Sequence, residues 1–378
     1  MRIGFLFHHR PDQLWHAAPI AFEMSLLETA LDVVIYCIND ALVATAHQIG
    51  SGYPGHRCRI ERIEQGRAIE MAGRLLRSWT SITKSAVLRL GTARFAALDA
   101  LVVPDLTSLA LRRRLPDLLM VFSNHGAGDR ARGYDPRIAR FDFVLVAGRK
   151  LERRFIEERL VRPGAYALVG YPKFDAVTAV SPIAPRPFAN DLPTVLYNPH
   201  FEPTLSSWPL WGVKILEFFC ANADRYNLIF APHLKLFEHH RRYGARLPER
   251  FHRCPNILID TDSAALTDMS YTRAADIYLG DVSSQVYEFL IEQRPCLFLD
   301  PRSIDWRNDP NYAHWLLGPV LTDLNALGPS LDRAKADHGH YRAQQKTAIA
   351  DTFDLSDTPS ARRAATAIRD FVAAHPQR

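Results

Sequence analysis

A polar turn between a buried strand and a helical run is the strongest sign of chemistry in this chain. The turn spans Gly280 to Ser283 and follows an apolar strand predicted over Ile277–Leu279. A helix is predicted over Gln285–Glu292, and Ser283 or Ser284 can cap its first turn. The first amides of a helix lack intrahelical partners and carry the positive end of its dipole, so they can bind a phosphate. From these residues alone, two interpretations stay open: a serine-capped helix and an anion site.

Further polar segments follow other predicted strands, which is where ligands bind in parallel sheets. A histidine in such a turn can act as a general base near neutral pH, and a glycine lets a ligand approach the backbone closely. A lone histidine in a loop is also a common structural residue. The segments are Ser123–Arg130, with His125, Gly126 and Gly128; Val169–Asp175, with Lys173; Tyr197–Glu202, with Asn198 and His200; and Phe230–Lys235, with His233 and Lys235.

Several well-known site motifs are missing from the sequence. There is no His-Glu-x-x-His motif, and the His239-His240 pair lies in a charged run typical of a solvated helix face, so no metal site is predicted. A P-loop is absent, and Gly126 and Gly128 lack the third glycine of a dinucleotide fingerprint. A Gly-x-Ser-x-Gly nucleophile elbow does not occur either. We therefore expect a site without a cofactor.

The composition is that of a globular protein with a mild excess of positive charge. Of the 378 residues, 47% are hydrophobic and 23% are charged, which excludes a disordered or fibrous chain and suits two α/β domains. The net charge of +5 favours phosphorylated ligands or an anionic membrane surface and does not by itself indicate nucleic acid. Five scattered cysteines argue against a disulfide framework. The short apolar run Met1–Phe7 is a predicted strand, and no apolar run approaches the roughly 20 residues that span a bilayer, so we expect a cytoplasmic protein.

Much of the positive charge lies in one segment, residues 66–94. Apolar residues recur there at helical spacing and arginines stand between them, which predicts a basic amphipathic helix. Its apolar stripe can pack on a sheet, or its arginines can face the headgroups of an anionic membrane. Peripheral contact with the inner face of the cytoplasmic membrane therefore stays an open alternative.

Apolar β-prone runs alternate with helical patterns through the chain, which predicts βαβ units and parallel sheets. A proline-rich stretch at 181–187 cannot continue a helix or a central strand. We predict two Rossmann-like domains with mostly parallel sheets that face a central cleft. The predicted parts are an N-terminal acceptor domain (1–180), a linker (181–193), a C-terminal nucleotide-donor domain (194–355) and a C-terminal helix (356–378) that can cross back to the first domain.

Taken together and in order, the polar segments resemble the CDP-glycerol glycerophosphotransferases of teichoic-acid and capsule synthesis. This resemblance covers roughly residues 120–300 and implies an α/β fold of the GT-B type. The motifs that carry it are His125-Gly126, Gly170-Tyr171-Pro172-Lys173-x-Asp175, Tyr197-x-Pro199, Pro232-His233 and Asp281-x-Ser283-Ser284-x-x-x-Glu288.

The resemblance implies a role for each matched residue. His125 matches the histidine proposed to deprotonate the acceptor hydroxyl, and His233 matches the histidine that steadies the donor pyrophosphate. The paired serines match residues that bind the same phosphates, Glu288 lies where the family has an aspartate near the ribose, and Asp260 or Asp262 lies where a nucleotide contact is expected. The expected set is His125 and His233 as catalytic residues, with Gly126, Lys173, Asn198, His200, Lys235, Asp260, Asp262, Asp281, Ser283, Ser284 and Glu288 as donor-binding residues.

The function that the resemblance implies is transfer of glycerol phosphate, or a related polyol phosphate, from a CDP-linked donor. The partners would be that nucleotide diphosphate donor and a hydroxyl of a glycan or lipid-linked acceptor in cell-surface polymer synthesis, with no nucleic acid. A second hypothesis is a GT-B glycosyltransferase or a non-hydrolysing epimerase that uses a nucleotide-sugar, which His200 and Glu202 mildly favour. A third is a nucleotide-binding module without turnover.

Overall fold

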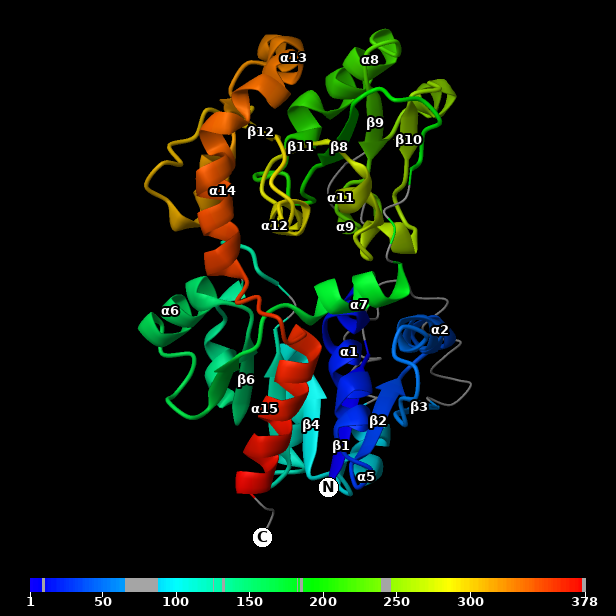
Figure 1. The fold of residues 1–378 in the computed structure, drawn as a ribbon, viewed down its shortest axis with the longest axis vertical. Helices are drawn as coiled ribbons and strands as arrows, with labels where there is room; N and C mark the ends of the chain where they lie inside the picture. Colours follow the sequence, from blue (N-terminus) through cyan, green and yellow to red (C-terminus); the bar gives the residue numbers. More distant parts are fainter. Residues whose placement is uncertain are drawn as a thin grey trace. The chain divides into compact units, whose positions relative to one another are not determined.

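The computed structural model describes residues 1–8, 11–64, 88–124, 126–130, 133–181, 183, 186–238 and 246–375. Position 125 and most of the predicted basic helix, residues 66–87, lie outside the described residues. The chain divides into two compact units, shown in Figure 1. Unit 1 comprises residues 1–126, 134–182 and 350–378, and unit 2 comprises residues 127–133 and 183–349.

Unit 1 is built on a seven-stranded sheet in the order β3-β2-β1-β4-β5-β6-β7, with every neighbouring pair parallel. Its central strands are continuous apolar runs because helices cover both faces of a parallel sheet. The strands are β1 (Arg2–Phe7), β2 (Asp32–Cys37), β3 (Arg59–Arg62), β4 (Ala100–Val103), β5 (Leu119–Ser123), β6 (Phe143–Val146) and β7 (Tyr166–Leu168). The helices are α1 (Asp12–Leu27), α2 (Asp40–Gly50), α5 (Thr92–Phe95), η1 (Leu106–Arg113), η3 (Pro136–Arg140), α6 (Arg149–Glu157), α7 (Pro172–Val180) and α15 (Ser360–Ala374).

Unit 2 has a six-stranded parallel sheet in the order β10-β9-β8-β11-β12-β13. Its strands are β8 (Thr194–Asn198), β9 (Asn227–Phe230), β10 (Ile257–Ile259), β11 (Ile277–Gly280), β12 (Cys296–Leu299) and β13 (Val320–Leu321). The helices are η4 (Trp208–Gly212), α8 (Val213–Ala221), α9 (Lys235–Glu238), η5 (Glu249–Arg253), η6 (Ala264–Leu266), α11 (Ser270–Ala274), α12 (Gln285–Phe289), η7 (Pro310–Leu317), η8 (Leu324–Ala326), α13 (Leu327–Asp337) and α14 (Gly339–Thr352), whose residues from Ala350 on belong to unit 1.

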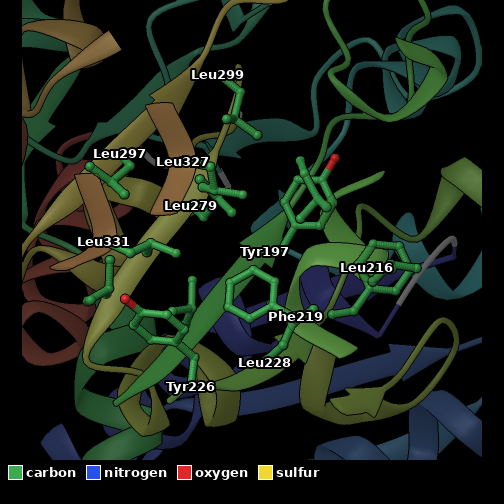
Figure 2. Packing of buried hydrophobic residues seen from close by; sticks show 14 of the residues in the cluster. Tyr197, Leu216, Phe219, Tyr226, Leu228, Leu279, Leu297, Leu299, Leu327 and Leu331 are labelled. Atoms are coloured by element: carbon green, nitrogen blue, oxygen red, sulfur yellow. The ribbon is translucent and has the colours of Figure 1, made fainter. Parts of the chain in front are cut away.

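The core of unit 2 shows how the apolar residues of the strands and helices fit together. Leu216 and Phe219 of α8 pack on the face of the sheet formed by Tyr197 and Leu228, as Figure 2 shows. All four side chains are fully buried, and each contributes on the order of 2 kcal/mol through the removal of apolar surface from water. This packing fixes the strands whose ends carry the polar turns.

The strand order of each sheet reverses direction at one point. In unit 1 the chain proceeds from β1 to β2 and β3 on one side, and then continues from β4 on the other side of β1. In unit 2 the corresponding neighbours are β8 and β11. Loops that leave such a pair of strands separate from each other and leave a crevice at the carboxyl ends, where ligands bind in open α/β sheets.

The C-terminal helix α15 packs against α1 within unit 1 (Figure 1). The Gly170–Asp175 motif holds its first turn: the Asp175 carboxylate accepts a hydrogen bond from the Ala361 N–H at 2.7 Å. Gly170 has a φ of +80°, and a Cβ there would lie 2.3 Å from the Ser360 hydroxyl, so only glycine fits. Burial raises the pKa of Asp175 to about 6, although the backbone donors of α15 oppose the shift.

Cys220 and Cys254 form a disulfide in unit 2, with their Cα atoms 5.6 Å apart. The expectation that the cysteines form no disulfide is therefore wrong for this pair. The two residues are 34 positions apart and come together because Cys220, in α8, and Cys254, at the end of η5, lie in elements that pack on each other. Spacing in the sequence does not reveal such a pairing.

Among the helices within the described ranges, none has the length and apolar character to cross a membrane.

Replacement of Asp175 by asparagine should change how stability depends on pH. A carboxyl with a raised folded-state pKa binds its proton more tightly in the folded protein, so its contribution is most favourable below the unfolded pKa and is lost as the pH rises through about 6. Asp175→Asn keeps an acceptor for Ala361 N–H but carries no charge. Relative to the wild type, it should gain about 1–3 kcal/mol of unfolding free energy between about pH 4 and pH 7.

Urea unfolding at the two pH values measures this difference, with Asp117→Asn, at an exposed position of unit 1, as the matched control. Parallel pH profiles for the wild type and Asp175→Asn would contradict the assignment.

Candidate functional site

Polar turns follow the three adjacent strands at the centre of the unit 2 sheet. His200 comes two residues after β8, His233 three residues after β9, and Asp281 directly after β11. Each histidine follows a proline: Pro199-His200 comes directly after β8, and Pro232-His233 follows β9 after one intervening residue. The His233 N–H donates to the Pro199 carbonyl at 3.0 Å. The two turns are therefore joined at the carboxyl edge of the sheet, at its point of reversal.

A backbone N–H two residues further along the chain donates to Nδ1 of each ring. Nδ1 of His200 accepts a hydrogen bond from the Glu202 N–H, and Nδ1 of His233 accepts one from the Lys235 N–H, both at 3.1 Å. In a neutral His233 ring the other nitrogen, Nε2, then carries the hydrogen. In His200 the Nε2 atom lies 2.6 Å from Arg130 Nη1, which can only donate, so the backbone bond does not decide the tautomer of that ring. The ring centroids lie 5.5 Å apart, and Phe201 contacts both rings. The two turns thus place two imidazole rings at this edge, and His233 offers an Nε2–H donor when its ring is neutral.

Asp281 is a buried acceptor that organises the neighbouring backbone. Its carboxylate accepts hydrogen bonds from the backbone N–H groups of His200 at 2.8 Å and Ser207 at 2.6 Å, and from the Ser207 hydroxyl at 2.8 Å. Burial raises the pKa of Asp281, against the effect of these donors. Asn198 is buried too, and its amide donates to the Ala231 carbonyl at 2.6 Å. Both side chains, expected to contact the donor, bond within the protein and position the turns.

The helix after the serine turn is shorter than the sequence predicts. The predicted helix over 285–292 ends at Phe289, because the Arg294 guanidinium donates to the Phe289 carbonyl at 2.6 Å and to carbonyls of preceding segments. Ser283 Oγ accepts from the Gln285 N–H at 3.3 Å, whereas Ser284 makes no side-chain cap bond. A single helical turn carries little dipole, so any anion affinity here must come from side chains and turn amides.

The remaining predicted donor residues of unit 2 differ in how they are held. Asp260, just after β10, accepts from Ser263 N–H at 3.0 Å and from the Tyr271 hydroxyl at 2.7 Å. Although burial alone would raise its pKa, these hydrogen bonds lower it below the usual range. Asp262 is exposed, Glu288 is buried within α12, and the Lys235 ammonium lies 5.2 Å from the centre of the Phe201 ring.

A loop that the sequence assigns to the first half of the chain belongs to unit 2. Asp129 is buried and accepts from the Tyr287 hydroxyl, at 2.9 and 2.7 Å to its two oxygens, and its carboxylate lies 3.0 Å from His314 Nδ1. Nε2 of His314 in turn bonds the Asp281 carbonyl at 3.0 Å. A Cβ at Gly128 would lie 3.0 Å from the Ser284 Cβ, so glycine lets the loop pass the serine turn closely.

The corresponding edge of unit 1 carries a largely buried pair of one histidine and one aspartate, His8 and Asp105, which the sequence analysis did not predict. His8 follows β1 and Asp105 follows β4, the two strands where the order reverses, and His8 Nε2 lies 2.8 Å from the Asp105 carboxylate. Ser108 Oγ is 3.1 Å from the same nitrogen. Burial alone would raise the pKa of Asp105, but the hydrogen bond and charge of His8 outweigh it and lower that pKa. An aspartate directly after the apolar run Ala100–Val103 and its proline was the signal that could have found the pair.

The predicted site residues of unit 1 do not gather in one described cluster. Lys173 is buried in α7, and the Gly126 N–H donates to Asn124 Oδ1 at 3.3 Å. The predicted base, His125, lies outside the described residues. In the part of the chain that the structure describes, no group of three or more His, Cys, Asp or Glu side chains is arranged to hold a metal ion.

No protein-family model matches this chain, and no curated protein matches its sequence. Solved structures with a similar fold include the wall teichoic acid polymerase TagF, which is 14% identical and has a TM-score of 0.64. The alignment covers 99% of this chain and 89% of the TagF chain. The UDP complex of MnaA from S. aureus is 12% identical (TM-score 0.59; 98% of this chain, 97% of that chain). UDP-GlcNAc 2-epimerase from Neisseria meningitidis, bound to UDP-GlcNAc, is also 12% identical (TM-score 0.55; 99% and 100%).

These likenesses confirm the predicted fold class, an α/β fold of the GT-B type with two mostly parallel sheets. The resemblance inferred from the motifs thus has a structural counterpart, since TagF is among the similar folds. At identities of 12–14% the likeness shows the fold alone.

Replacement of Asp281 by asparagine should destabilise unit 2 strongly. The new NH2 group must face at least one of the N–H donors of His200 and Ser207, which leaves a buried donor without its acceptor. We expect a loss of about 2–4 kcal/mol in the free energy of unfolding, against about 1 kcal/mol for Ser207→Ala.

Urea unfolding measures both losses. Asp323→Asn, which alters an exposed aspartate that caps η8, is the control and should cost about 1 kcal/mol or less. An unfolding free energy of Asp281→Asn equal to that of the control would show that Asp281 does not organise the turns.

Proposed function

We propose that this chain is a transferase that moves glycerol phosphate, or a related polyol phosphate, from a CDP-linked donor to a hydroxyl of a glycan or lipid-linked acceptor. The observation that carries the proposal is the pair of Pro-His turns, which lie with the Asp281 turn at the carboxyl edge of the unit 2 sheet and include the Nε2–H donor of a neutral His233. Hydrogen-bond donors at that position suit the phosphates of an activated donor. The motif order and the fold shared with TagF support the choice of donor.

The proposed chemistry needs no covalent intermediate. An acceptor oxygen attacks the phosphorus that bears glycerol, the bond from that phosphorus to the bridging oxygen breaks, and CMP leaves with the electron pair. His233 and the hydroxyls of Ser283 and Ser284 stabilise the charge that develops on the leaving group. His125 accepts the proton of the attacking hydroxyl.

The other residues of the expected set divide by their contacts. Side chains already bonded within the protein hold the turns in place, which is the role we assign to Asn198, Asp260 and Asp281. Asp262 is exposed and available to the nucleotide. The proposal also includes contacts of the donor with Gly126, Lys173, His200, Lys235 and Glu288. It includes contact of a membrane with residues 66–94 as well.

A nucleotide-sugar epimerase is the second candidate, and His200 is the observation that favours it. Its ring occupies the same edge as His233, and Glu202 lies two residues further along the chain. The folds of MnaA and UDP-GlcNAc 2-epimerase are similar to this one. An epimerase would interconvert UDP-sugars without an acceptor, whereas the transferase would release CMP only when an acceptor is present. A nucleotide-binding module would do neither.

Incubation of the purified protein with CDP-glycerol and a membrane or glycan fraction should release CMP in proportion to the acceptor. His233→Ala should lower kcat about 10²–10³-fold, because it removes a donor that faces the developing charge. His125→Ala should lower turnover while CDP-glycerol binding, measured by calorimetry, is kept.

His252→Ala, at an exposed position of η5, is the control and should match the wild type. Conversion of UDP-GlcNAc without CMP release would favour the epimerase instead. Nucleotide binding with no turnover of either substrate would favour the regulatory module.

A further inference from the structure

A buried imidazole ring, that of His314, joins two polar segments at the carboxyl edge of unit 2. His314 lies in η7, which follows β12, and is 3% exposed. Its Nδ1 lies 3.0 Å from the Asp129 carboxylate, and its Nε2 lies 3.0 Å from the Asp281 carbonyl oxygen. All three residues belong to unit 2. None of the sequence motifs includes this histidine.

The two contacts call for a hydrogen on each ring nitrogen. A carbonyl oxygen can only accept, so Nε2 of His314 donates to Asp281, as Trp315 Nε1 does at 2.9 Å. At Nδ1 the partner is the Asp129 carboxylate, which also accepts from the Tyr287 hydroxyl and from the His314 backbone N–H at 3.2 Å. These donors favour the ionised carboxylate, and an ionised carboxylate can only accept from Nδ1. The ring is therefore an imidazolium that donates in two directions.

Through these two contacts the ring connects a loop to a turn. Asp129 lies in the 127–133 loop, and its carboxylate is buried. Asp281 begins the turn that carries the two serines. Loop and turn also approach each other directly, because a Cβ at Gly128 would lie 3.0 Å from the Ser284 Cβ. A shift of the ring would therefore move the loop relative to the serine turn.

We propose that His314 is a positioning residue that, as an imidazolium, holds the 127–133 loop against the Asp281–Ser284 turn. Its Nδ1–H holds the loop and its Nε2–H holds the turn, so both contacts are lost together when the ring is replaced. The connection itself depends on no reaction. Its effect on turnover rests on the proposed function, in which the hydroxyls of the turn stabilise the leaving group.

NMR of isotope-labelled histidine in the full chain tests the charge of the ring. Slightly above neutral pH an exposed imidazole is mostly neutral and carries one hydrogen, whereas the His314 ring should show a hydrogen on each nitrogen. The His314 signals are those that His314→Gln removes. A ring with a single hydrogen would overturn the proposal.

Hydrogen exchange tests whether the ring holds the loop. Glutamine is neutral and carries its side-chain hydrogens on one nitrogen, so His314→Gln cannot span the two acceptors as the ring does. The amides of residues 127–130 and of the turn should then exchange about 10-fold faster or more, because local opening costs less free energy. Unchanged exchange in His314→Gln would contradict the proposed connection.

Two further variants keep this test decisive. Tyr287→Phe removes another donor to the Asp129 carboxylate, so it should speed exchange of the loop by a smaller factor, and it serves in place of His314→Gln if that protein unfolds. His338→Gln is the matched control, because it changes a histidine of the same unit that bonds Gln345. Its loop and turn should exchange like those of the wild type.

Turnover separates this inference from the proposed function. In a wild type that releases CMP from CDP-glycerol, His314→Gln should lower kcat about 10-fold and change KM less than about 3-fold, because it loosens the turn without removing a bond to the donor. A kcat equal to that of the wild type would overturn the positioning role. A doubly protonated ring and faster exchange of the loop in His314→Gln support the inference even when no CMP is released.

Discussion

The buried carboxylate of Asp281 is the interaction on which the carboxyl edge of the unit 2 sheet depends. It accepts the N–H groups of His200 and Ser207 and the Ser207 hydroxyl, so the segments that follow β8 are tied to the end of β11. Its own carbonyl accepts from His314 and Trp315, which ties the segment after β12 to the same point. A charge in this position is expensive to bury and therefore requires its donors. The hydrogen bonds of this one carboxylate therefore connect the segments after β8 to the end of β11.

The Pro-His turns show how a short sequence can set the chemistry of a ring. Proline ends the strand and has no N–H to give to the sheet, and the backbone N–H two residues after each histidine turns toward Nδ1. In a neutral His233 ring the hydrogen is consequently held on Nε2. In His200 the Arg130 guanidinium donates toward Nε2, so the two turns have the same backbone pattern but different surroundings.

The strands were predictable because central strands of parallel sheets are continuous apolar runs, as in Ala100–Val103 and Cys296–Leu299. Properties set by distant parts of the chain were not predictable. The helix after Ser284 ends early because Arg294 takes its last carbonyl, and Cys220 meets Cys254 through the packing of their elements. The grouping of residues 127–133 with unit 2 depends on buried contacts of Asp129 with residues more than 150 positions away.

The two sheets place an aspartate at the same topological point and use it differently. In unit 2 the Asp281 carboxylate, which follows β11, accepts the backbone N–H groups of His200 and Ser207. In unit 1 the Asp105 carboxylate, which follows β4, lies 2.8 Å from Nε2 of the His8 ring. Although burial alone would raise the pKa of Asp105, this contact lowers it. The same position of the topology therefore uses an aspartate to hold backbone amides in unit 2 and to hold an imidazole ring in unit 1.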